Sequence, residues 1–195
     1  MQVLSFDALV NKPWKNGGGI TRDIARGLHL SQTIWTLSRA DVSQDGPFSD
    51  FSGMTRILTV VSGGTMTLTS PSGIIQANFW QPVRFDGALA VHSHLKDGPL
   101  TNLNLMFDPQ FCTGDVVLRK GSLTYQTSRP EYGLIALHTL AGEPIVEGTA
   151  LCAGDTAFIT DKNAALSLSN GDVLLEIRLT YLDQRSAIKL CIAER

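Results

Sequence analysis

The chain has few of the residues on which disulfide frameworks, metal centres and nucleic-acid interfaces depend. Its 195 residues include 3 cysteines and 4 histidines. The cysteines, Cys112, Cys152 and Cys191, are odd in number, widely spaced and without a CxxC pair, so we expect reduced thiols and an intracellular protein. Charged residues make up 17% of the chain and the formal net charge is −2. Without a basic field, we expect no nucleic-acid partner.

Membrane and targeting segments are also missing. No apolar run approaches the length of a membrane span, and residues 1–7 (MQVLSFD) lack the basic and apolar regions of a signal peptide. These absences predict a cytoplasmic protein with no membrane partner. The chain also contains no GxSxG motif, no Walker loop and no GxGxxG motif followed by an acidic residue. The sequence therefore predicts no catalytic residue of a familiar kind.

Strand patterns are what the chain has in abundance. Residues 33–38, 56–61 and 65–69 alternate or are β-branched, and glycine-rich turns separate them. Residues 40–44 and 6–10 show a short helical period, and 183–195 fit a short helix or a tail. Short strands at even spacing predict an all-β sandwich or barrel with short helices.

The second half resembles a looser copy of the first. LTVVSGG at 58–64 is similar to LHTLAGE at 137–143, and PVRF at 82–85 is similar to DTAF at 155–158. A repeat of about seventy residues predicts two similar barrels or jelly rolls that share an interface, because each alone would have a small core. We therefore predict domains at 1–110 and 111–195, with residues 107–121 as the connection.

Residues 14–21 (WKNGGGIT) place three glycines after an aromatic residue, a cation and an amide. Such a glycine run persists where the backbone needs positive φ or where another group comes close. A carboxylate would suit this place, with backbone N–H donors near it. The alternative is a tight turn between two strands, with Trp14 as a core anchor.

Three blocks of residues, in order over the first 108, resemble the HutD/Ves family of bacterial proteins. The first is PWKNGGG at 13–19 with Thr21 and Ile24. The second is GPFS at 46–49 with Phe51, Gly53 and Arg56, followed by Gly63 and Gly64. The third is DGP at 97–99 with NLM at 104–106. The resemblance implies a bicupin, that is, two cupin barrels in one chain. It also implies that the protein binds a small metabolite of histidine utilisation and moderates that pathway, with no catalytic activity.

Three positions depart from the family pattern. Asp23 stands where glutamate is usual, Ser52 where proline is usual, and Asn102 where an acidic residue is common. The change at Asn102 removes a charge from the strand face that also carries Asn104. If that face lines the pocket, we expect the ligand preference of this chain to differ from that of its relatives.

Two further patterns suggest chemistry. On a strand, His92 and His94 share a face, as in metal-binding cupins, but His29 and His138 lie far away in sequence and no glutamate follows closely. We therefore predict no metal and no cofactor. Arg56 opens an apolar strand and offers a rigid fork to a carboxylate. Its alternative role is a salt bridge to Asp50 or Asp23.

The residues together predict a metal-free pocket in the first barrel that binds a small carboxylate metabolite. Lys15 and Arg56 would meet the carboxylate, whereas Asn102 and Asn104, which are costly on an apolar strand unless partnered, would read an amide, formyl or imidazole-like edge. The predicted ligand-binding residues are Trp14, Lys15, Asn16, Gly17, Gly18, Arg56, Asn102 and Asn104. The alternatives are a cupin-type enzyme, metal-dependent through His92 and His94 or acting on an amino-acid or sugar derivative, and an interaction protein whose second barrel forms a homodimer.

Overall fold

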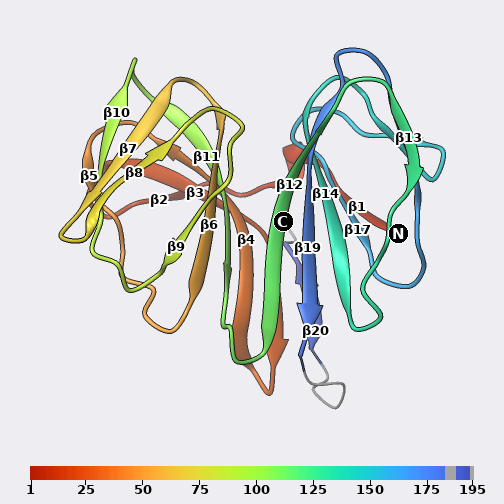
Figure 1. The fold of residues 1–195 in the computed structure, drawn as a ribbon, viewed down its shortest axis with the longest axis horizontal. Coiled ribbons are helices and arrows are strands. Elements are labelled where there is room, and N and C mark those ends of the chain that lie inside the picture. The colour runs from red at the N-terminus through yellow and green to blue at the C-terminus, as the bar shows by residue number, and fades with distance from the viewer. Residues whose placement is uncertain (183–187, 194–195) are drawn as a thin grey trace. The chain divides into compact units, whose positions relative to one another are not determined.

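The computed structural model describes residues 1–182 and 188–193, whose strands divide into two compact units (Figure 1). The N-unit contains Val10–Gln110 together with Ile188–Ile192. The C-unit contains Met1–Leu9 and the chain from Phe111 up to the final strand. Among the described residues, no helix is long and apolar enough to cross a membrane.

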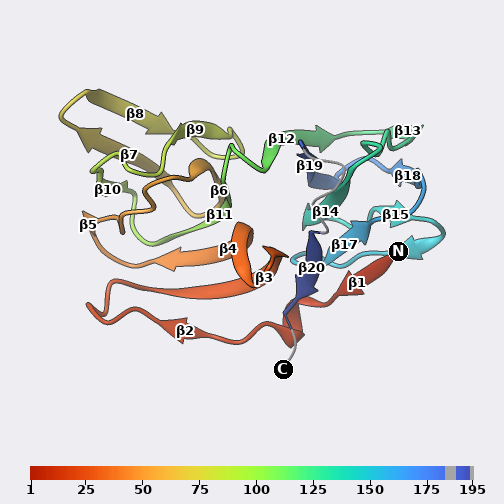
Figure 2. The same ribbon diagram turned by 90° about the horizontal axis from the view of Figure 1, so that it is seen from below.

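The N-unit is built from two antiparallel sheets packed face to face. The larger sheet has the order β2 (Lys12–Pro13), β3 (Gly19–His29), β4 (Gln32–Val42), β11 (Leu100–Phe107), β6 (Thr55–Ser62) and β9 (Val83–Asp86), and β20 (Lys189–Ile192) also pairs with β3. The smaller sheet has the order β5 (Gly46–Pro47), β10 (His92–Lys96), β7 (Thr65–Ser70) and β8 (Gly73–Ala77). In Figure 2, β2, β3 and β4 follow one another across the larger sheet. One apolar cluster joins both sheets, with Leu58 and Val60 from β6 and Met66 and Leu68 from β7.

The C-unit repeats this construction. Its larger sheet has the order β1 (Gln2–Leu4), β17 (Thr156–Ile159), β14 (Gly133–Ala141), β19 (Val173–Tyr181) and β12 (Cys112–Lys120). Its smaller sheet has the order β13 (Leu123–Gln126), β18 (Ala165–Leu168), β15 (Ile145–Val146) and β16 (Thr149–Ala150). A second apolar cluster, which includes Ile135, Leu137, Leu166 and Leu168, fills the space between these sheets.

The internal repeat seen in the sequence corresponds to a repeat of strand order. The order β4-β11-β6-β9 in the N-unit recurs as β12-β19-β14-β17 in the C-unit. The similar segments at 58–64 and 137–143 begin in β6 and β14, which occupy the same place in this order. The all-β prediction is confirmed, and the sheets are open.

Four local predictions need correction. Residues 107–121 are mostly the strand β12, whose alternating burial marks it as part of a sheet, so they are not a connection. Residues 40–42 continue β4, and of residues 6–10 only Phe6–Ala8 form a 3-10 turn. At the C-terminal end, Lys189–Ile192 form β20, whereas 183–187 and 194–195 lie outside the described residues.

The two ends of the chain are exchanged relative to the sequence-based division at residue 110. Strand β1 pairs with β17 of the C-unit, and β20 pairs with β3 of the N-unit. Each therefore completes a sheet built mainly from the other half of the chain. A strand of three or four residues carries no local signal that tells which sheet it joins, so the sequence pattern missed this exchange.

Candidate functional site

A cavity of about 620 Å³ lies within the N-unit, and one face of the larger sheet forms its floor. Floor residues occupy alternate positions of neighbouring strands, as side chains on one face of a sheet do. The register sets Asn104 opposite Ser38 and Ser38 opposite Asp23. The floor comprises Thr21, Asp23, Thr36, Ser38, Ala40, Arg56, Asn102, Asn104 and Met106. The cavity therefore lies in the part of the sandwich interior where polar side chains replace the apolar core.

Arg56 is the buried cation of this floor. Its side chain comes from β6 and is 7% exposed. Both Nε and Nη2 donate hydrogen bonds to Asn104 Oδ1, at 2.9 and 2.8 Å. No ion pair within the described part of the chain includes Arg56, so neither of the salt bridges considered from the sequence is formed.

Aromatic rings surround the Arg56 guanidinium. Its carbon lies 4.3 Å from the centroid of the Phe48 ring, with Phe85 and Phe51 at 5.5 and 5.8 Å. Such ring faces attract a cation but do not neutralise it. Burial lowers the pKa of Arg56 to about 10, which still leaves the side chain charged near neutral pH. The floor thus holds a buried positive charge that no carboxylate of the described residues balances.

The amides beside Arg56 leave a donor unused. Asn104 Nδ2 donates to Asn102 Oδ1, and both side chains are buried. Asn102 Nδ2 has no hydrogen-bond partner among the described residues, nor does the buried hydroxyl of Thr36. Buried polar groups without a partner are rare in proteins and are costly. An unpaired cation and an unpaired N–H donor on one floor favour an anionic or acceptor-bearing ligand.

The segment 14–16 forms part of the cavity rim. Trp14 Nε1 donates to Thr21 Oγ1 at 2.8 Å, which fixes the indole against β3. At Gly19, a Cβ atom would lie 2.3 Å from the carbonyl oxygen of Asp41 and 3.0 Å from the indole, so no other residue fits there. This close approach lets Trp14, Lys15 and Asn16 reach the cavity, which all three line.

Gly17 and Gly18 do not have the predicted role. Neither lines the cavity. The amide of Gly17 donates to the carbonyl oxygen of Trp14, and the amide of Gly18 donates to Asn16 Oδ1, both at 3.0 Å. Gly17 also has a positive φ of 72°. These two glycines therefore form the turn and offer no free backbone donor to a ligand, which corrects that part of the sequence-based site.

The cavity lining contains two further charged residues. Lys15 is exposed and lines the cavity. Asp23 contributes a carboxylate to the lining, and Lys12 forms an ion pair with it. Among the described residues, the rim therefore carries an exposed cation and the floor a carboxylate paired with Lys12, whereas the charge without a counter-charge is that of Arg56.

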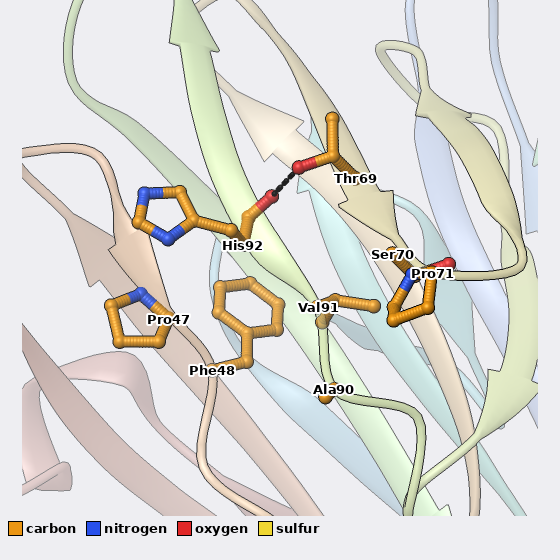
Figure 3. A pocket seen from close by; sticks show the side chains of 8 residues that line it. All are labelled: Pro47, Phe48, Thr69, Ser70, Pro71, Ala90, Val91 and His92. Atoms are coloured by element: carbon orange, nitrogen blue, oxygen red, sulfur yellow. Dashed lines mark hydrogen bonds between the residues drawn. The ribbon is translucent and has the colours of Figure 1, made fainter.

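His92 and His94 lie on the smaller sheet and do not line this cavity. Their ring centroids are 4.9 Å apart, and the nitrogens of His94 lie 3.2 Å from Asp45 Oδ2 and 3.2 Å from Thr69 Oγ1. Figure 3 shows His92 beside Pro47 and Phe48 in a shallow pocket of about 380 Å³. Within the described residues, no group of three His, Cys, Asp or Glu side chains is placed to hold a metal ion.

Several lining residues were not identified from the sequence as ligand-binding. Thr36 and Ser38 lie on the face of β4 that faces the cavity, and Phe48 and Phe51 cover Arg56. The alternation of 36, 38 and 40 marks one strand face, but alternation alone does not show that this face is the polar one. Phe48 and Phe51 stand in the same family block as Arg56, so that block could have identified them as neighbours of the site.

The fold and the site together show the class of protein: it is an all-β protein with a cupin-like fold and a polar cavity in one of its two units. The HutD family model matches residues 7–175, and the chain belongs to the HutD family.

Relatives agree with this assignment. The chain is 36% identical, over 115 residues, to an uncharacterized 21.2 kDa protein in the hutC 3' region of Pseudomonas putida; the match covers 56% of this chain and 60% of that protein. It is 28% identical to protein Ves of Cronobacter sakazakii, covering 87% of this chain and 93% of the relative. The solved structure of HutD from Pseudomonas fluorescens SBW25 matches with a TM-score of 0.81 and 28% identity, over 93% of this chain and 99% of that one.

Proposed function

We propose that this protein binds a small carboxylate metabolite in the N-unit cavity without catalysis and, through that binding, moderates histidine utilisation in the cytoplasm. The observation that carries the proposal is the buried charge of Arg56, which has an amide and aromatic rings around it but no carboxylate partner in the described chain. A buried charge without a counter-charge is costly. A bound carboxylate would remove that cost and would take a bidentate position on the guanidinium.

The link to histidine utilisation comes from family membership. The family model is that of HutD, and the P. putida relative is named for its place in the hutC 3' region. These names support the role of a pathway-linked binder, and the cavity chemistry supports the ligand class. We also propose that each unit is a cupin-like barrel, with the boundary near residue 110, because the order of four strands repeats between the units.

A thermal-shift screen tests the binding proposal. Histidine, urocanate, formiminoglutamate, formylglutamate and glutamate share a carboxylate and differ at the other end. We expect at least one of them to raise the melting temperature at micromolar concentration, because a ligand that binds the folded state alone stabilises it.

The double variant Lys15→Ala, Arg56→Ala should lose this rise. A matched control, Lys120→Ala with Lys162→Ala, removes two exposed cations from the C-unit and should keep it. If the rise is the same in the Arg56 double variant and in the unaltered protein, the assignment of the site is wrong.

A further inference from the structure

The hydrogen bonds beside Arg56 have a fixed direction. A guanidinium group only donates hydrogen bonds, so Asn104 must turn its oxygen toward Arg56. The NH₂ group of Asn104 then faces Asn102, which must present its own oxygen in turn. This leaves the NH₂ group of Asn102 at the end of this series of hydrogen bonds. Flipping either amide would set two donors or two acceptors against each other.

The terminal NH₂ group of Asn102 lies where a ligand could meet it. Asn102 lines the cavity, its side chain is 1% exposed, and Nδ2 has no partner among the described residues. Its oxygen is already used by Asn104. Asn102 therefore offers the cavity an unpartnered N–H donor, whereas its oxygen already accepts a hydrogen bond from Asn104.

The second donor stands apart from Arg56. The Asn104 amide and the carbonyl of Asn102 lie between the Arg56 guanidinium and Asn102 Nδ2, because Asn104 bonds to Arg56 on one side and to Asn102 on the other. Arg56 binds at Asn104. A ligand whose carboxylate lies at Arg56 thus needs a few carbon atoms before its next polar group comes near Asn102.

We propose that Asn102 determines ligand specificity in this cavity: it selects ligands with a second hydrogen-bond acceptor, such as an acyl carbonyl or a second carboxylate, and disfavours ligands with an ammonium or amidinium group there. This inference rests on the proposed function, since it takes a carboxylate at Arg56 as given. It goes further by dividing carboxylate metabolites into acceptor-ended and donor-ended classes.

The unaltered protein supplies the first test, by titration calorimetry with matched monocarboxylates. Pentanoate and 4-oxopentanoate carry the same charge and differ by one carbonyl oxygen, whereas 4-aminopentanoate carries an ammonium at the same carbon. The corresponding six-carbon acids, with the group at carbon 5, cover a second spacing. We expect the oxo acid to bind about tenfold more tightly than its parent at one spacing or the other, and the amino acid to bind most weakly.

Two asparagine variants locate the effect. Asn102→Asp replaces the free NH₂ group by an acceptor and keeps the oxygen that Asn104 needs. In this variant, the oxo acid should lose its advantage over the parent acid, and the amino acid should no longer be the weakest ligand. Asn11→Asp adds the same charge to the N-unit outside the cavity lining and keeps the acceptor for Arg22. This control should preserve the order of the three ligands.

Each outcome is decisive. If pentanoate and hexanoate bind but the oxo acids gain nothing at either spacing, the role of Asn102 is wrong while the carboxylate site stands. An equal loss of preference in the Asn102→Asp and Asn11→Asp variants would assign the preference to overall charge, which also overturns the proposal. If no carboxylate binds, the proposed function fails and this inference fails with it. The ligand series on the unaltered protein decides the matter even if Asn102→Asp does not fold.

Discussion

The two units place polar side chains at equivalent positions of their larger sheets, but the charged group at or beside this position has a counter-charge in the C-unit and none in the N-unit among the described residues. In the N-unit, Asn104 on β11 stands opposite Leu58 on β6. In the C-unit, Glu176 on β19 stands opposite Leu137 on β14, and Leu58 and Leu137 are equivalent in the internal repeat. The amide of Asn104 meets a cation that lacks a counter-charge, whereas the carboxylate of Glu176 is fully partnered.

The partners of Glu176 come from several strands. Its Oε2 accepts hydrogen bonds from Arg119 Nε at 2.9 Å and from Tyr125 OH at 2.5 Å, and Arg178 lies 3.5 Å from Oε1. Burial by itself raises the pKa of Glu176, but the bonds from Tyr125 and Arg119 and the nearby positive charges outweigh it and hold the pKa below its usual value. Burial, together with the bond to Glu176 and its charge, raises the pKa of Tyr125.

The charge of Glu176 is thus structural, whereas we propose that the charge of Arg56 binds a ligand. The Glu176 cluster satisfies its own charge within the fold, so a ligand would have nothing to add. The Arg56 cluster has no counter-charge among the described residues, and in the proposed function an anionic ligand supplies it. The repeat thus carries a carboxylate with internal cation partners in one unit and an amide beside an unbalanced cation in the other, and the two cations, Arg119 and Arg56, stand on non-equivalent strands.

The largest effect is expected when Asn104 of the N-unit is replaced by glutamate, the residue at the equivalent position of the C-unit. In Asn104→Glu, the new carboxylate would pair with Arg56, neutralise it and repel a carboxylate ligand. We expect affinity for carboxylates, measured by calorimetry, to fall by at least about 100-fold. Asn104→Gln, which adds the same length without charge, should keep the affinity within about tenfold. Binding that survives in Asn104→Glu would contradict the central role of the uncompensated charge.

The converse change tests the C-unit. Glu176→Gln keeps the shape and an acceptor for Tyr125 but leaves Arg119 without its counter-charge. We expect the free energy of unfolding, measured with urea, to fall by about 2 kcal/mol, within the range for partly buried charged hydrogen bonds. Carboxylate binding should stay unchanged within a factor of about two. A variant that lost binding while keeping its stability would show that the roles of the two clusters are not separate.

The free energy of unfolding at acid pH tests the role of Glu176 in a second way. The pKa of Glu176 is below its ordinary 4.5 in the folded protein, so the unfolded chain takes up a proton first as the pH falls. The stabilisation from Glu176 is therefore complete above about pH 4.5 and is lost as the pH falls through the lower folded value. Urea midpoints measured down the acid range should show the difference between the unaltered protein and Glu176→Gln shrinking below that pH. A difference that stays constant would refute the lowered pKa.

The smallest effect is expected at the rim. Lys15 is exposed, so solvent and salt screen its attraction for an anion. Lys15→Ala should weaken carboxylate binding by about two- to threefold at low salt and by less at high salt, as measured by calorimetry at two ionic strengths. A loss as large as that of Asn104→Glu would move the main charge contact from the floor to the rim.

The sequence predicted much of the fold because strand signals are local. Residues 56–61 are mostly β-branched and 65–69 alternate, and their strands appear where these patterns place them. The open form of the sheets and the exchange of β1 and β20 depend on pairing over long distances, which no local pattern encodes. Strand β12 was missed because its turn-like Thr-Gly-Asp start at 113–115 reads as a loop.

The candidate site was foreseen in part. One cavity is lined by Trp14, Lys15, Asn16, Arg56, Asn102 and Asn104. Alternation places the two amides on one strand face, and Arg56, which stands opposite Met106 on the neighbouring strand, bonds to Asn104. Gly17 and Gly18 fell outside it, since a glycine run has the same composition whether its amides serve a turn or a ligand. The unpaired donor of Asn102 follows from the direction of three hydrogen bonds, which only coordinates can reveal.

A crystal structure grown with 4-oxopentanoate tests the central claim most directly. We expect the ligand carboxylate at the Arg56 guanidinium, with hydrogen bonds of about 2.7–3.2 Å. A ligand bound in the shallow pocket beside His92, or a cavity that holds only water at saturating ligand, would contradict it.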